Sequence, residues 1–213
     1  MFKSKAAAAA LIPLSLVACS TPDNEITDMG ITATRSACPA VAIPAATGDI
    51  TLFNPENSRD ASAIDVVANI TNLRSTCDES GDQIVTNVTF DVQARRRDSR
   101  GAREVVLPYF AVAVQGGTQI QSKSVGRVGL RFADGELRAS TSASATGQVS
   151  RAAATLPEDI RQQITRRRKP GDPSAAIDPM ADPAVREAVR RASFEVLVGF
   201  QLTQDQLAYN ATR

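Results

Sequence analysis

The fold class is decided by residues 84–95, which read IVTNVTFDVQAR. Apolar side chains recur with a period of two on one face, and polar side chains occupy the other face. The apolar face carries Ile84, Val88, Phe90, Val92 and Ala94. A period of two with a single apolar face is typical of a half-buried strand in an antiparallel sheet. The stretch therefore predicts a strand that packs one face against a core.

Similar strand signals lie on both sides of this stretch. They cover Ile50 to Leu52, 64–71, 105–114, 120–132, 137–149 and 194–202. Gly116-Gly117 and Asp134-Gly135 separate neighbouring signals, and such pairs are typical of tight turns between antiparallel strands. Pro108 has no backbone N–H to donate, so we expect its strand to lie at an edge or a bulge.

Seven or eight short strands in a chain of 213 residues predict a single all-β domain. We expect an immunoglobulin-like antiparallel β-sandwich, because that architecture buries many short strands in a chain of this size. Tryptophan, which true immunoglobulin domains carry in the core, is absent. The expectation therefore concerns the architecture alone.

A helical insertion is predicted at about residues 152–192, before the last strand. Thr155-Leu156-Pro157-Glu158 has the pattern of a capping box with proline in the first turn. Asp182-Pro183 predicts the start of a second helix. Each helix carries a narrow apolar stripe, too small for a core of its own, so we expect both to lie on the sandwich or on a partner. Thr203 to Gln206 predicts the cap of a short terminal turn.

The N-terminus has the order of a secretory leader. Lys3 and Lys5 precede an apolar run at 6–17, which is too short to span a bilayer. Leu16-Val17-Ala18-Cys19 resembles the bacterial lipobox. The resemblance implies that residues 1–18 are removed as a signal peptide and that Cys19 is lipidated. Because Ser20 rather than aspartate follows the cysteine, the resemblance also implies the outer membrane.

Residues 19–37 are polar, and we interpret them as a lipidated tether to a domain at 38–213. The C-terminal residues Gly199 to Thr203, with Gln206-Leu207 and Tyr209-Asn210, resemble small alphaproteobacterial outer-membrane lipoproteins. Pro108-Tyr109-Phe110 and the two remaining cysteines extend the resemblance more weakly. Members of that group generally have no assigned function, so the resemblance implies a location and no chemistry.

Charge and composition restrict the function. Loss of Lys3 and Lys5 with the leader changes the net charge from +1 to −1, whereas a nucleic-acid binder would carry a large positive excess. Histidine is absent, which excludes Ser-His-Asp and Cys-His catalysts and removes the commonest imidazole metal ligand. We therefore expect a protein that is not an enzyme and that has no cofactor, no metal and no nucleic-acid partner.

Once Cys19 is lipidated, the thiols of Cys38 and Cys77 remain. An exported chain meets an oxidising compartment, so a disulfide between them is the default expectation. A reactive thiol pair or a metal site would be the alternative. The sequence lacks the CxxC motif, histidine or third thiolate that would support either alternative.

Two basic clusters are candidate contacts for phosphate groups or for a partner. One contains Arg95, Arg96 and Arg97, and the other contains Arg166, Arg167, Arg168 and Lys169. The alternative is a solvated loop in the first case and, in the second, cations that complement the helix dipole.

The sequence favours a non-catalytic, periplasm-facing outer-membrane lipoprotein that binds or scaffolds an envelope protein. The alternative is a module for an anionic lipid or glycolipid of the envelope. An apolar cavity between the sheets, or convergence of the two basic clusters on one face, would favour that alternative. An enzyme that uses carboxylates alone would need two close buried acids.

Overall fold

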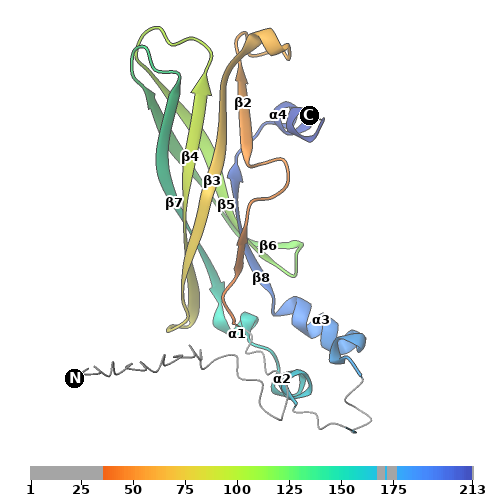
Figure 1. The fold of residues 1–213 in the computed structure, drawn as a ribbon. Coiled ribbons are helices and arrows are strands. Elements are labelled where there is room, and N and C mark those ends of the chain that lie inside the picture. The colour runs from red at the N-terminus through yellow and green to blue at the C-terminus, as the bar shows by residue number, and fades with distance from the viewer. Residues whose placement is uncertain (1–35, 167–170, 172–176, 213) are drawn as a thin grey trace, which may run out of the picture.

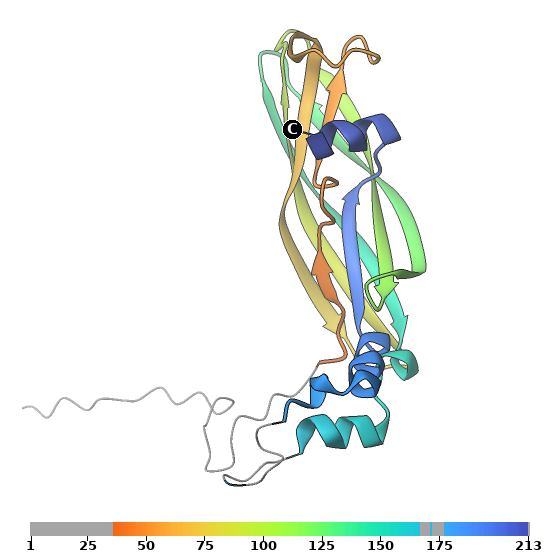
Figure 2. The ribbon, with the colours of Figure 1, turned by 90° about the vertical axis from the view of Figure 1, so that its right-hand side faces the viewer.

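Two four-stranded β-sheets pack face to face in the computed structural model, which describes residues 36–166, 171 and 177–212 (Figure 1 and Figure 2). Sheet A has the strand order β1-β8-β5-β6, and sheet B has the order β2-β3-β4-β7. The predicted β-sandwich is therefore confirmed. The strands are β1 (Ala40–Ala42), β2 (Asp49–Phe53), β3 (Ile64–Asp78), β4 (Gln83–Arg96), β5 (Arg103–Gln115), β6 (Gln119–Phe132), β7 (Arg138–Ser150) and β8 (Phe194–Phe200).

The stretch at 84–95 forms β4, which pairs with β3 on one side and with β7 on the other. Its side chains alternate as the sequence predicts. Val88, Phe90 and Val92 point into the sandwich and are at most 1% exposed. Several strands are longer than expected, and β3 continues for seven residues beyond Thr71 to Asp78. The 14 residues of β4 make the sandwich roughly 45 Å long at about 3.4 Å per residue.

The expected edge or bulge position of the strand with Pro108 is wrong. This strand, β5, is paired on both sides, with β6 and with β8, and its one register shift lies at Ala113/Val114. Proline is tolerated because pairing with β8 begins only at Tyr109. Just past the end of β8, the carbonyl of Pro108 still accepts a hydrogen bond from the backbone N–H of Gln201 at 2.9 Å. The missing donor therefore falls where β8 has already ended.

The space between the sheets is filled by side chains from both of them. Phe90 of sheet B and Phe132 and Phe200 of sheet A are the largest side chains of this main cluster. A smaller cluster of Ile84, Ala113, Val149, Ala154 and Phe194 lies where the sandwich meets the helices.

The helical insertion lies between β7 and β8, as predicted. It contains α1 (Arg151–Ala154), α2 (Glu158–Thr165), the 3-10 turn η3 (Pro179–Ala181) and α3 (Pro183–Arg191). Asp182 caps α3 by accepting from the N–H of Ala184 at 2.8 Å, which confirms the predicted start. The predicted capping box is wrong, because α2 begins after Pro157 without a side-chain cap. The hydroxyl of Thr155 instead donates to the carbonyl of Arg151.

The apolar stripes of these helices pack on each other. Ile160 of α2 and Val185 and Ala188 of α3 are buried in one cluster, together with Met180 of η3. The expectation that the stripes are too small for a core of their own is therefore wrong. That the insertion contacts a partner stays a prediction.

The terminal turn is a nine-residue helix, α4 (Gln204–Thr212). Thr203 and Gln206 form the predicted cap, in which each side chain bonds to the backbone N–H of the other. The side-chain amide of Asn210 donates to the carbonyls of Ala46 and Asp49, which holds α4 beside β2.

The two ends of the sandwich differ. We call one end the N-terminal pole, because the start of the described chain, the β3–β4 turn and helices α1, α2 and α3 lie there (Figure 1 and Figure 2). The distal pole is the opposite end, which carries the loops at 54–63, 97–102 and 133–137.

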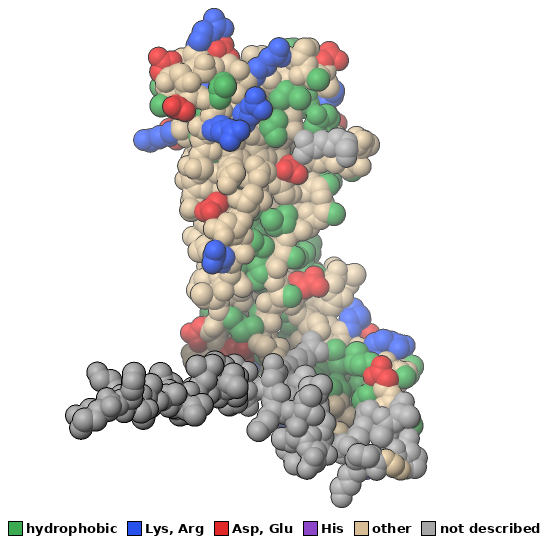
Figure 3. Space-filling view, in the orientation of Figure 1, with side chains coloured by type: hydrophobic (Ala, Val, Ile, Leu, Met, Phe, Trp, Pro, Cys, Tyr) green, Lys and Arg blue, Asp and Glu red, His purple; other side chains and the backbone are tan. Residues whose placement is uncertain are grey.

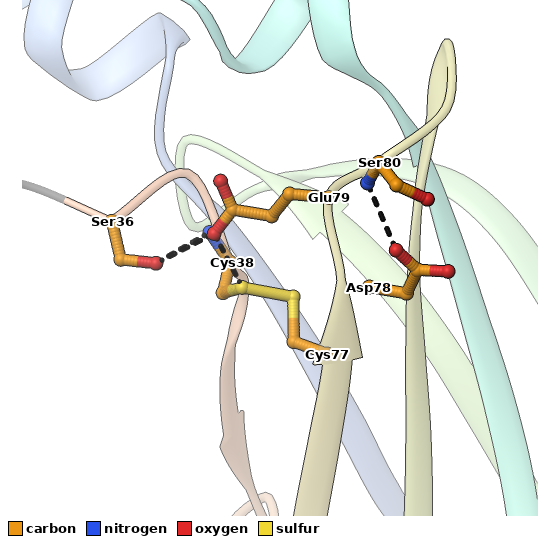
Figure 4. Close-up of a disulfide and its surroundings, with 6 residues drawn as sticks. All are labelled: Ser36, Cys38, Cys77, Asp78, Glu79 and Ser80. Atoms are coloured by element: carbon orange, nitrogen blue, oxygen red, sulfur yellow. Dashed lines mark hydrogen bonds between the residues drawn. A yellow bond between two sulfur atoms is a disulfide. The ribbon is translucent and has the colours of Figure 1, made fainter.

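The predicted disulfide is confirmed and lies at the N-terminal pole (Figure 4). Cys38, which precedes β1 of sheet A, is joined to Cys77 of β3 in sheet B, with 6.1 Å between their Cα atoms. Ser36 continues this attachment, since its hydroxyl donates to the carboxylate of Glu79 at 3.0 Å. The first described residues are thus fixed to the turn between β3 and β4.

We expect the disulfide to stabilise the domain without being needed for its fold. The bond closes a loop with a sequence separation of 39, which contributes about 4 kcal/mol through the entropy of the unfolded chain. The double variant Cys38→Ser, Cys77→Ser should lower the free energy of unfolding in urea by up to that amount. A reductant should do the same to the parent chain and leave the variant unchanged. Equal stability of the oxidised and reduced parent would contradict this role.

Candidate functional site

Some of the site residues predicted from the sequence lie outside the described residues. This applies to Cys19, to the tether up to residue 35, and to Arg167, Arg168 and Lys169. Arg166 is described and is exposed at the C-terminal end of α2, at the N-terminal pole. Arg95, Arg96 and Arg97 lie at the end of β4 at the distal pole. The structure therefore does not bring Arg166 and the first basic cluster together.

Arg96 faces the core and is not available to a ligand. It is only 2% exposed, and its guanidinium donates four hydrogen bonds of 2.6–2.8 Å to backbone carbonyls. Two of these carbonyls, Ser99 and Gly101, lie in the β4–β5 loop, and two, Ala133 and Glu136, lie in the β6–β7 turn. The prediction that Arg96 contacts a phosphate group or a partner is therefore wrong.

The guanidinium of Arg96 also lies over the ring of Phe132, 5.2 Å from its centroid. A buried cation needs such compensation, since an uncompensated charge in the interior is costly. Arg96 therefore joins two loops of the distal pole to the core.

Two further arginines near the cluster are neutralised by acids. Arg100 pairs with Asp98 at 2.7 Å, and its guanidinium and backbone N–H lower the pKa of that carboxyl to about 2. Arg103 forms a two-pronged ion pair with Asp65. Arg95 and Arg97, by contrast, point to solvent and have no acidic partner among the residues that the structure describes.

Sheet B places a third arginine beside Arg95. The two strands β4 and β7 are antiparallel, and Arg138 lies directly opposite Arg95 on the outer face. Like charges directly opposite each other across a sheet are unfavourable. Neither guanidinium has an acidic partner in the described part of the chain. Basic side chains accordingly gather toward the upper end of this face (Figure 3).

These arginines border a shallow hollow of about 650 Å³ on the outer face of sheet B. Two neighbouring rows across β3, β4 and β7 line it. The first row is Val67, Arg95 and Arg138, and the second row is Asn69, Gln93 and Ser140. No carboxylate lines this hollow.

The next row along the sheet contains Asp91, whose charge is already compensated. Its carboxylate accepts hydrogen bonds from Ser142 at 2.7 Å and from Asn72 at 2.8 Å. These two bonds lower the pKa of Asp91 below its usual range. The charge of this carboxylate next to the hollow is thus compensated within the sheet itself.

A second hollow lies between β2, the β2–β3 loop and the start of α4. Its cations are paired, Arg59 with Asp205 at 3.4 Å and Arg103 with Asp65 at 2.6 Å. Arg59 also lies over the ring of Phe53. This hollow offers no unpaired arginine, so the outer face of sheet B is the stronger candidate for a binding site.

The described residues support neither a metal site nor a pair of catalytic carboxylates. Cys38, Cys77 and Glu79 bring three potential metal ligands together, but the sulfurs are joined in a disulfide and are not thiolates. Within the ranges that the structure describes, Arg96 is the one buried charged residue. The two close buried acids that a carboxylate enzyme would need are therefore not among these residues.

Arg138 was not identified from the sequence as a site residue. It stands alone after a turn and is 43 positions from Arg95. Only the pairing of β7 with β4, two strands that are not neighbours along the chain, brings it to the site.

We expect Arg96 to matter for stability and Arg95 not to. Arg96→Met should lower the free energy of unfolding by about 3 kcal/mol, because four carbonyls lose a charged donor. Arg95→Met, one residue away on the outer face, should change it by less than about 0.5 kcal/mol. Chemical denaturation of both variants measures the difference. Equal effects would contradict the inward role of Arg96.

Comparison with known proteins identifies no relative. No family model, no curated protein and no solved structure matches the chain. Within the described residues, none of the helices combines the length and the apolar character that crossing a bilayer requires.

Proposed function

We propose that this protein is a non-catalytic, lipid-anchored module of the bacterial outer membrane that presents a binding face to an anionic component of the envelope. The observation that carries the proposal is the pair Arg95 and Arg138. The two guanidiniums are exposed, lack acidic partners in the described chain and lie at the pole opposite to the N-terminal attachment.

Anchoring through Cys19 would attach the domain to the membrane at its N-terminal pole. Sixteen residues separate Cys19 from Ser36, the first described residue, and a random coil of that length spans roughly 22 Å. Such a tether would keep the N-terminal pole near the membrane. The distal pole would then stand farther out by roughly the 45 Å length of the strands. A partner away from the membrane surface is therefore within reach of Arg95 and Arg138.

The charge of the distal face favours an anionic partner. Two like charges held opposite each other gain from an anion that bridges them, and arginine forks match carboxylate and phosphate groups. The predicted envelope protein remains a candidate if it has an acidic surface.

The lipid or glycolipid alternative has less support when it refers to the anchoring membrane. Arg166 and the unpaired arginines of the distal face lie at opposite poles, and the space between the sheets is filled by the core. The turn nearest to the N-terminal attachment also carries Asp78, Glu79 and Asp82, which anionic headgroups would repel.

Anchoring can be tested at Cys19. Cys19→Ala should abolish fatty-acid labelling and leave the precursor unprocessed by the lipoprotein peptidase, because the thiol is the acylated group. Metabolic labelling and mass measurement of the N-terminus would show this. A chain that is cut and labelled as before would exclude the anchor.

Binding at the outer face of sheet B can be tested by crosslinking in cells. A photo-crosslinking residue at Ser140 should capture a partner, and the same residue at Val106, on the outer face of sheet A, should not. Arg95→Glu with Arg138→Glu should abolish the adduct. Arg127→Glu should leave it, because Arg127 is an exposed arginine of sheet A, with no ion pair to another described residue. An adduct that survives the double reversal would contradict the proposed face.

A further inference from the structure

The hollow on sheet B is lined by polar side chains that make no hydrogen bond with other described residues. In two rows further along the face, polar side chains on neighbouring strands bond to each other, as Ser142 does to Asp91 and Thr146 does to Asn87. In the two rows of the hollow they do not. The polar side chains of these rows that make no hydrogen bond or ion pair with any other described residue are Arg95, Arg138, Asn69, Gln93 and Ser140.

The two rows supply different chemistry. Arg95 and Arg138 offer only charged donors, which suit a carboxylate or a phosphoryl group. Gln93 and Asn69 each offer an amide that both donates and accepts, and the hydroxyl of Ser140 does the same. Groups that donate and accept together are complementary to hydroxyls. The hollow thus combines a site for an anion with a site for neutral hydroxyl groups.

The spacing joins these two sites into one. Adjacent rows on one face of a sheet are about 7 Å apart, and neighbouring strands are about 5 Å apart. One molecule can therefore place its anionic group on the arginine row and its hydroxyls on the row of Gln93. Val67, which is half-buried beside Arg95, offers an apolar surface to the carbon atoms of such a molecule.

From these observations we infer that the hollow binds a hydroxyl-bearing anion, namely an acidic or phosphorylated saccharide unit of an envelope polymer or glycolipid. This inference rests on the proposed function, because it names the ligand class of the same face. An acidic protein surface fits less well. Its carboxylates would satisfy the arginines, but an ionised carboxylate has no donor of its own for the acceptors of Asn69 and Gln93.

The test uses the full-length protein in a non-ionic detergent and a set of small probes. Glucuronate and glucose 6-phosphate should each bind at least ten-fold more tightly than acetate, inorganic phosphate or glucose, because only the first two occupy both rows. Titration followed by amide chemical shifts of β4 and β7 measures the affinities and locates the site.

Variants separate the two rows. Arg95→Gln and Arg138→Gln should each weaken glucuronate binding about ten-fold, since each removes a charged donor. Gln93→Ala with Ser140→Ala should lower the affinity for glucuronate to the affinity for acetate, and should leave the affinity for acetate unchanged. Arg127→Gln on sheet A is the matched control and should change nothing.

Binding to lipid vesicles distinguishes the two possible sources of the ligand. Vesicles of phosphatidylglycerol, whose headgroup is also a hydroxyl-bearing anion, are compared with vesicles of phosphatidylcholine. Binding to the former that glucuronate displaces would place the ligand on a lipid. Binding of glucuronate without binding to vesicles would place it on a saccharide.

Several outcomes would overturn the inference, and they differ in what they leave standing. Equal affinity for glucuronate and acetate would remove the hydroxyl site and keep an anion-binding face. Binding of a glutamate-rich peptide without binding of glucuronate would make the partner an acidic protein, so the proposed function would stand and the saccharide would not. If no anion binds, and if the crosslinked adduct survives Arg95→Glu and Arg138→Glu, both the saccharide inference and the proposed function would be contradicted.

Discussion

Burial of the apolar face of β4 is the constraint on which the rest of the structure depends. Side chains of a strand alternate between its two faces, so placing Val92 and Ala94 in the core also fixes the three arginines that follow. Arg96 must point inward, and Arg95 and Arg97 must point outward. A shift of one residue in the register would reverse all of these positions. The same alternation that forms the core therefore divides one basic run into a structural arginine and two surface arginines.

The inward position of Arg96 has consequences for the distal pole. A buried guanidinium needs acceptors, and the loops at 97–102 and 133–137 supply four backbone carbonyls. Both loops are thereby held against the core by one side chain. The second of these loops leads directly into β7 and so sets where Arg138 begins the strand opposite Arg95. Through this loop, the buried Arg96 contributes to the position of Arg138 opposite Arg95.

The sequence predicts those features of the fold that depend on local interactions, and it misses those that depend on contacts between distant segments. Period-two alternation, the turns at Gly116-Gly117 and Asp134-Gly135, and the cap at Asp182 are local signals, and each predicted its element correctly. The prediction for the strand with Pro108 was wrong, because whether a sheet tolerates a proline there depends on where β8 ends. The pairing of β5 with β8 is a contact between distant segments. The apolar stripe of each helix is narrow by itself, whereas α2 and α3 bury their stripes together, which the pattern of a single helix does not reveal. Arg138 was missed for the same reason, since it meets Arg95 only through the order of strands in sheet B.

The proposed site and the proposed anchor depend on each other. A shallow hollow on a rigid sheet needs little ordering when it binds, but it stays open to water, so a single saccharide unit would bind weakly. Many anchored copies in one membrane would present many such hollows to one repetitive polymer. The second contact would then form at the high effective concentration that the first contact creates. Weak contacts of this kind hold a polymer firmly only while the copies share a surface. An anchor at one pole and an anion-binding face at the other are therefore the two parts that this mode of binding requires.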